Sequence, residues 1–158
     1  MNAAPSSAAP FRGGGTIADQ IAIRELIERY ADACCTRDAD MLASLWAEDG
    51  RWGVEGMPDL DGVDRDAVMA GWKRGMGQLS FAFVSFMPGR IDIDATGTSA
   101  EGRTYSYEII TSPNGTGRTA VGLYRDRFAR IGGRWLFTER LWSMLHAQGD
   151  YIHAGETA

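Results

Sequence analysis

Hydrophobic residues in the first part of the chain recur at the spacing of a helix. From residue 16 to residue 37, apolar side chains stand three or four positions apart, and charged side chains occupy the positions between them. This period predicts an amphipathic helix over 16–37. Thr16 is its expected N-cap, and Asp19, three positions later, completes a capping-box pattern.

The next fifty residues mix short elements. The pattern predicts a helix over 39–47 with Asp38 as its N-cap, a short strand over 51–55, and a third helix over 64–76. In both helices the apolar residues fall on one face. These helices are therefore expected to cover a core rather than to stand alone.

After Gly77 the pattern changes to an alternation of apolar and polar residues, which is typical of strands. The turn signal Pro113-Asn114-Gly115 is the clearest break between two of them. Pro88-Gly89 lies inside the first strand and predicts a bulge or bend there. Four long strands are expected, over 80–93, 99–111, 116–130 and 134–146.

Helices followed by a meander of long strands indicate an α+β fold. We expect a strongly curved antiparallel sheet that wraps around the long N-terminal helix, with two shorter helices, as a cone with an internal pocket. With 158 residues, 44% of them hydrophobic, the chain has room for one packed domain. We expect this domain over 16–148, between a disordered tail over 1–15 and a C-terminal tail over 149–158.

Charge and hydropathy narrow the possible partners. The formal net charge of −5 argues against nucleic acid and against an anionic membrane surface. No stretch approaches the roughly 20 apolar residues of a membrane span, and the first residues lack the features of a secretory signal. A cytoplasmic protein that binds a hydrophobic small molecule is the expectation.

The chain has few of the usual catalytic side chains. It contains two histidines, two adjacent cysteines and one lysine, Lys73. Two histidines and vicinal cysteines do not provide the spaced ligand pairs of a zinc site, and no phosphate-binding loop is present. We therefore expect neither metal nor cofactor, and we interpret Cys34 and Cys35 as reduced thiols.

Several segments resemble one superfamily. Residues 22–30, 38–56, 91–94, 100–105 and 132–135 are similar to corresponding segments of the nuclear transport factor 2-like superfamily and, more narrowly, of its SnoaL-like branch. The resemblance extends over 17–146. It implies a cone-shaped fold and cofactor-free chemistry like that of the scytalone dehydratase, bile-acid dehydratase and hexachlorocyclohexane dehydrochlorinase members. It does not by itself select an activity, because this fold carries many.

One departure from the family is specific. In those enzymes an acid near the end of the first helix orients a histidine on the following strand, and this histidine takes a proton from the substrate. At the corresponding places this chain has Cys35 and, approximately, Val84. The Asp–His dyad is therefore absent, so that either other residues perform the chemistry or the protein binds without catalysing.

Four residues are candidates for proton transfer. The resemblance gives Tyr30 and Glu108 the places of a catalytic tyrosine and a pocket acid, and Glu108 in an apolar cavity would have a raised pKa. Arg140 could stabilise an anionic intermediate. His146 continues the parity of Arg140 along the last strand and could supply the missing base. Each has a structural alternative: a core tyrosine, a solvent or interface carboxylate, a salt-bridged arginine, and an exposed strand-end histidine.

Aromatic residues exceed what a core of this size needs, since the chain has five Trp, five Tyr and six Phe. Some of them are expected to line the pocket or an oligomer interface. The candidate substrate-binding residues are Cys35, Trp46, Trp52, Trp72, Phe83, Phe86, Tyr124 and Trp142. We also expect a homodimer or homotrimer, because one sheet face would otherwise expose Tyr105 and Tyr107.

The leading hypothesis is a cofactor-independent lyase acting on a hydrophobic, aromatic or polycyclic hydroxylated molecule. It would eliminate water or halide, or release formaldehyde from a lignin-derived diaryl compound by retro-aldol-type C–C cleavage. A ketosteroid-isomerase-like isomerase and a non-catalytic small-molecule-binding module are the alternatives.

Overall fold

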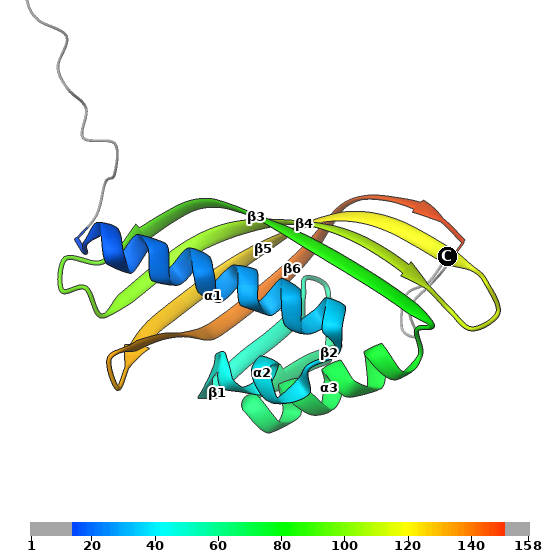
Figure 1. The fold of residues 1–158 in the computed structure, drawn as a ribbon, viewed down its shortest axis with the longest axis horizontal. Helices are drawn as coiled ribbons and strands as arrows, with labels where there is room; N and C mark the ends of the chain where they lie inside the picture. Colours follow the sequence, from blue (N-terminus) through cyan, green and yellow to red (C-terminus); the bar gives the residue numbers. More distant parts are fainter. Residues whose placement is uncertain (1–13, 151–158) are drawn as a thin grey trace, which may run out of the picture.

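A curved six-stranded sheet with three helices on its inner side forms the fold (Figure 1). The computed structural model describes residues 14–150, so nearly all of the expected N-terminal tail, most of the C-terminal tail, and His153 lie outside the described residues. The elements in chain order are α1 (Ile17–Thr36), α2 (Ala39–Ser44), β1 (Trp46–Val54), β2 (Met57–Val63), α3 (Arg65–Gly77), β3 (Phe81–Ile93), β4 (Ser99–Thr111), β5 (Gly117–Ile131) and β6 (Arg134–Gly149).

Helix α1 begins as the sequence predicts. The Thr16 hydroxyl accepts a hydrogen bond from the backbone N–H of Asp19, and the Asp19 carboxylate accepts one from the backbone N–H of Thr16, which is a complete capping box. Asp19 also accepts a hydrogen bond from the indole N–H of Trp135 in β6 at 3.1 Å. The capping box therefore defines where α1 begins, and the bond to Trp135 fixes that end of the helix against the sheet.

The strands follow the order β2-β1-β6-β5-β4-β3. Neighbouring strands are antiparallel except for β1 and β6, which run parallel. Strands β3 and β4 pair from Phe81 opposite Thr111 to Ile93 opposite Ala100, and their register shifts between Pro88 and Ile91, which confirms the bulge expected at the Pro-Gly pair. The predicted α+β class with a curved sheet around the N-terminal helix is confirmed.

Two local expectations were wrong. Helix α2 ends at Ser44 and not at residue 47, because Trp46 already pairs with Phe137 as the first residue of β1. Strand β2 (Met57–Val63) was not expected, because it contains a proline, a glycine and two aspartates. Such residues are tolerated in β2 because it is one of the two edge strands of the sheet.

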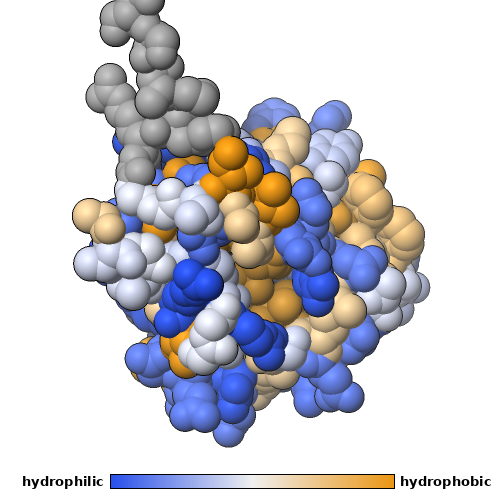
Figure 2. All heavy atoms as spheres, turned by 60° about the vertical axis from the view of Figure 1, so that its left-hand side comes forward, coloured by the Kyte–Doolittle hydropathy of each residue, from blue (hydrophilic) through white to orange (hydrophobic). Residues whose placement is uncertain are grey.

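The two faces of the sheet differ in character. The inner face packs under α1 and carries the main core, including Ile91, Phe128 and Phe137. On one side of the molecule, apolar side chains gather at the centre of the surface between polar ones (Figure 2). The outer face of β3 and β4 exposes Tyr105 and Tyr107, as expected, at 36% and 39% of their surface. The homo-oligomer that this exposure suggested stays a prediction.

Among residues 14–150, no helix combines the length and apolar character needed to cross a membrane.

The capping box gives a prediction about acid stability. The backbone N–H of Thr16, the indole of Trp135 and the Thr16 hydroxyl lower the pKa of Asp19 to about 2. A carboxyl whose folded pKa lies below its unfolded value of about 3.9 stabilises the fold above that value, and the contribution disappears as pH falls toward 2. We expect Asp19→Asn to lower Tm at pH 7 and to lower it much less at pH 2.5, as measured by circular dichroism. An equal loss at both pH values would contradict this assignment.

Candidate active site

A buried ion pair lies at the centre of the inner face. Arg140 of β6 and Asp126 of β5 are opposite each other in register, and both side chains are fully buried. The Arg140 Nε donates to Asp126 Oδ1 at 2.8 Å, and the Thr104 hydroxyl of β4 donates to Asp126 Oδ2 at 2.6 Å. Three adjacent strands thus fix the orientation of one guanidinium group.

Aromatic rings surround the rest of this guanidinium. Its central carbon lies 4.0 Å from the ring centroid of Tyr124, 4.4 Å from Tyr30, 4.5 Å from Phe137 and 4.9 Å from Phe86. Such contacts are favourable for a desolvated cation. Burial lowers the pKa of Arg140, but the negative charge and hydrogen bond of Asp126, together with Tyr124 and Tyr30, outweigh it and leave that pKa raised. The interior therefore contains a permanent positive charge.

Glu108 of β4 lies on the same inner face. Its Cα partners are Val84 in β3 and Ala120 in β5. Burial raises the pKa of the half-buried Glu108 above its ordinary value, and the Ser106 hydroxyl and the positive charges of Arg118 and Arg140 oppose that rise. Glu108 is thus a carboxyl group poised to hold or release a proton near the buried arginine.

A glycine lets Trp142 reach across the sheet. The Trp142 indole N–H donates to the Ser106 hydroxyl at 3.1 Å, although β5 separates their strands. A Cβ on Gly122 of β5 would lie only 1.9 Å from the Trp142 Nε1, so that no larger residue fits beneath the indole. Gly122 therefore permits the bond that places Ser106 and Trp142 beside Glu108.

Helix α1 closes the cluster from above with Tyr30 and Cys34. Both are buried, at 4% and 6% exposure. Burial raises the pKa of Tyr30 well above its ordinary value, which keeps its hydroxyl protonated. Burial also raises the pKa of the Cys34 thiol to about 12, so Cys34 is not a thiolate nucleophile at neutral pH.

Four nitrogen donors in this region are buried without a hydrogen-bond partner. They are the indole nitrogens of Trp46, Trp52 and Trp72, and Nη1 of Arg140. The Trp52 indole lies near the Tyr124 hydroxyl, and the Trp72 indole near the Cys34 thiol, without bonds of good geometry. An unsatisfied buried donor costs roughly 1–3 kcal/mol.

The structure does not bring His146 to the other three candidates. A bulge in β6, with Leu145 as the extra residue opposite the step from Val121 to Gly122 in β5, lets Met144 face Gly122 and His146 face Val121. Since directly paired residues share a face, Met144 stays on the inner side and His146 moves to the outer side, where it is exposed. The expectation that His146 continues the parity of Arg140 was wrong.

Two expected substrate-binding residues also lie elsewhere. Phe83 pairs with Ile109 on the outer face and is 42% exposed, so it does not line the interior. Cys35 is exposed where α1 contacts β3, and Cys34 faces the interior instead. Strict alternation in β3 and the helical rotation of α1 explain both corrections.

Cys35 and Val84, the two positions to which the resemblance assigns the acid and the histidine, lie in contact. The Cys35 Sγ is 3.3 Å from both the backbone N and the backbone O of Val84. The thiol is bonded to the backbone, and an isopropyl side chain stands where a base would be. This pair offers no proton-transfer chemistry.

The remaining expected residues stay together. Trp46, Trp52, Trp72, Phe86, Tyr124 and Trp142 are on the inner side and are buried or half-buried around Arg140 and Glu108. Sequence reasoning missed Asp126 and Thr104, which hold the arginine. Asp126 shares its parity with Tyr124 and Phe128, and that signal could have placed it on the inner face.

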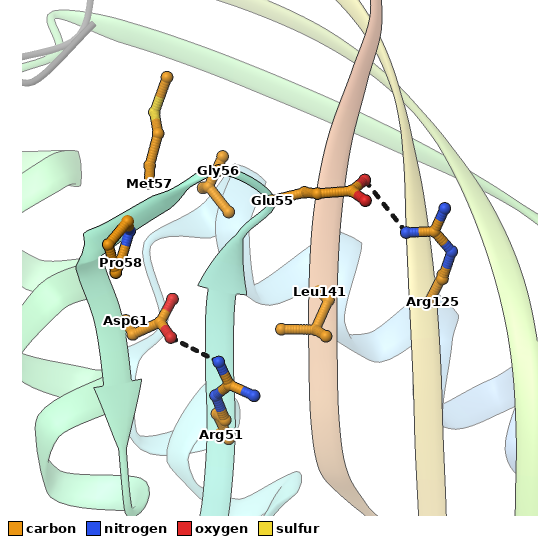
Figure 3. Close-up of a pocket in the computed structure, with 9 residues that line it drawn as sticks. Arg51, Glu55, Gly56, Met57, Pro58, Asp61, Arg125 and Leu141 are labelled. Carbon is orange, nitrogen blue, oxygen red and sulfur yellow. Dashed lines mark hydrogen bonds and ion pairs between the residues drawn. The ribbon is translucent and has the colours of Figure 1, made fainter.

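The outer side of the sheet carries a separate pocket of about 210 Å³ beside the β1–β2 turn (Figure 3). Its charges are already paired, Arg51 with Asp61 at 2.5 Å and Arg125 with Glu55 at 3.1 Å. No group of three or more metal-ligating side chains occurs among residues 14–150. The residues of the inner cluster are therefore the better candidates for catalysis.

This architecture, a curved sheet around one long helix with polar groups held in an aromatic interior, defines the class of cone-shaped proteins of the nuclear transport factor 2-like superfamily. Within it, the sequence model of the SnoaL-like domain matches residues 15–141. The chain belongs to the SnoaL-like domain family.

Solved structures share the fold. A type 2 hexachlorocyclohexane dehydrochlorinase (LinA) superposes with a TM-score of 0.76 at 15% identity, covering 89% of this chain and 94% of its own. A scytalone dehydratase-like protein from Novosphingobium aromaticivorans gives 0.75 at 20% identity, covering 87% and 91%. A nuclear transport factor 2-like protein with a cystatin-like fold from the same species gives 0.67 at 27% identity, covering 81% and 82%. Among curated proteins, none matches the chain in sequence.

The buried ion pair gives a prediction about stability. Asp126→Ala leaves the Arg140 charge buried without its counter-ion, which costs about 3–5 kcal/mol of unfolding free energy. Glu25→Ala breaks the exposed Glu25–Arg29 pair on α1 and should cost at most about 0.5 kcal/mol. Urea denaturation followed by tryptophan fluorescence measures both. Similar small losses would show that the interior does not depend on the pair.

Proposed function

We propose that the protein is a cofactor-independent lyase that eliminates a small group from a hydrophobic, aromatic or polycyclic hydroxylated molecule. The observation that carries the proposal is the position of Glu108, a desolvated carboxyl in the same interior as Tyr30 and Arg140. Fold neighbours that include a dehydrochlorinase and a dehydratase-like protein agree with it. Family membership alone does not select the reaction.

In the proposed dehydration, Glu108 takes a proton from the carbon next to the one that carries the hydroxyl group. The electron pair of that C–H bond forms the new double bond as the C–O bond breaks. Tyr30 donates its phenolic proton to the departing oxygen, and water leaves. The proton on Glu108 then returns to Tyr30 through solvent, and Arg140 stabilises the negative charge that develops meanwhile.

The same groups could serve retro-aldol-type cleavage of a lignin-derived diaryl compound. Glu108 would then take the proton of the substrate hydroxyl, the adjacent C–C bond would break to release formaldehyde, and Tyr30 would protonate the resulting carbanion. An isomerase would move a proton and release nothing. Product mass separates the three reactions. Dehydration lowers the mass by one water, the cleavage lowers it by one formaldehyde, and isomerisation leaves it unchanged.

A binding module without catalysis is the second candidate, and one observation favours it. Cys35 and Val84, to which the resemblance assigns the positions of the family's acid and histidine, contact each other without a base. Binding of aromatic ligands without turnover over a broad panel of aryl hydroxy ketones, alcohols and halides would favour this alternative.

Substituting the two proton-transfer residues tests the lyase. Glu108→Gln and Tyr30→Phe keep the approximate size of each side chain and remove the group that accepts or donates the proton, so each should lower kcat by about 10²–10⁴-fold with the fold intact. Glu101→Gln, on the exposed outer side of the same strand β4, is the matched control and should keep full activity. Wild-type turnover in both interior variants would overturn the assignment.

The raised pKa of Glu108 gives a pH prediction. A base works in its deprotonated form, so kcat/KM should rise with pH, with its midpoint above 4.5, the ordinary value for this carboxyl. The profile is measured by stopped assays between pH 4 and pH 9. A midpoint at or below 4.5 would show that the carboxyl is fully solvated or is not the base.

A further inference from the structure

One buried hydrogen bond crosses a whole strand of the sheet. The Trp142 indole N–H of β6 donates to the Ser106 hydroxyl of β4 at 3.1 Å, and β5 lies between these two strands. Ser106 is fully buried, and Trp142 is buried as well. The bond passes over Gly122, where a Cβ would lie 1.9 Å from Trp142 Nε1 and 2.7 Å from Ser106 Oγ. The two polar groups thus meet at a place that a larger residue in β5 would close.

The chemistry of the two groups fixes the direction of this bond. An indole N–H can only donate, so the Ser106 oxygen accepts, and the proton of its hydroxyl group stays available for another acceptor. Ser106 and Glu108 stand two positions apart in β4 and therefore project from the same face. Both Ser106 and Trp142 are near enough to the Glu108 carboxyl to favour its charged form by hydrogen bonding.

Other charged or titratable groups approach Glu108 from α1, β5 and β6. They are Cys34 of α1, Arg118 and Tyr124 of β5, and Arg140 of β6. The two arginines favour the carboxylate through their positive charge. Burial raises the pKa of Cys34 and of Tyr124, so both stay protonated and uncharged at neutral pH. Ser106 and Trp142 differ from all four because they act on Glu108 as neutral hydrogen-bond donors.

We propose that Trp142 and Ser106 are positioning residues that hold Glu108 as a carboxylate, through a chain of hydrogen bonds that runs from the Trp142 indole to the Ser106 hydroxyl and on to Glu108. This inference rests on the proposed function, and it specifies how the proposed base is kept in the form that accepts a proton. Hydrogen bonds in a chain strengthen one another in a dry interior. The indole therefore makes Ser106 a better donor than an isolated serine.

The titration of Glu108 tests the chain without turnover. Carbon-13 NMR of the full chain, labelled at the glutamate carboxyl carbons, follows this titration between pH 4 and pH 9, and Glu108→Gln identifies the signal. Ser106→Ala and Trp142→Phe each remove one donor. Each should lower the acid dissociation constant of Glu108 about three- to tenfold, which raises its pKa. If the lyase is also correct, the midpoint of kcat/KM against pH should rise in the same variants.

The sign of the change separates positioning from a purely structural role. Burial already raises the pKa of Glu108. A variant that merely loosened the interior would admit water and would lower that pKa toward its ordinary value. Gly122→Ala keeps both donors but places a methyl group against the indole nitrogen, so it should raise the pKa as Trp142→Phe does. Trp135→Phe is the matched control, because its indole is bonded to Asp19, and it should leave the titration unchanged.

An unchanged or lowered pKa of Glu108 in Ser106→Ala, or in both Trp142→Phe and Gly122→Ala, would overturn the proposal. Activity separates this outcome from failure of the lyase. If the pKa rises as expected but the wild-type protein eliminates nothing from any substrate of the panel, the positioning role stands and the lyase fails. If the wild-type protein does eliminate, and these variants leave the titration unchanged, the lyase stands and the positioning role fails.

Discussion

Burying the Arg140 guanidinium beside the Asp126 carboxylate removes two charges from water, and the surrounding strands and α1 must replace the contacts that water made. Thr104 supplies a hydrogen bond to the carboxylate, and four aromatic rings approach the guanidinium carbon within 5 Å. The pair joins β4, β5 and β6 to the helix. A buried ion pair of this kind adds little net stability compared with apolar residues of similar size, because the cost of desolvation offsets the attraction between the charges.

The interior combines a cation that cannot lose its proton, a carboxyl whose pKa is raised, and a tyrosine that stays protonated. Under the proposed function, separate environments on the sheet and on α1 give acid and base different roles, which is how enzymes carry out proton chemistry at neutral pH. Histidine is not required for such a division. Under the proposed function, Cys35 and Val84 can therefore stand at the positions to which the resemblance assigns the family's acid and histidine without making proton transfer impossible.

The sequence predicts the features that depend on long periodic patterns. The capping box at Thr16, the long helix and the four long strands are local in origin, and the structure contains them all. The pairing of Asp126 with Arg140 depends on the register between two strands, which no local pattern reveals. Strand β2 was missed for the opposite reason, because its composition resembles a loop and only its pairing with β1 makes it a strand.

The bulge in β6 determines which of its side chains lie on the same face of the sheet as Glu108. His146 faces Val121 on the outer side, and its neighbour Ala147 faces Ala120, which is itself the register partner of Glu108. An imidazole at position 147 would thus lie on the same face as the carboxyl, two strands away, without replacing any core side chain. Without the extra residue of the bulge, His146 would face Ala120 and would lie on the same side of the sheet as Glu108.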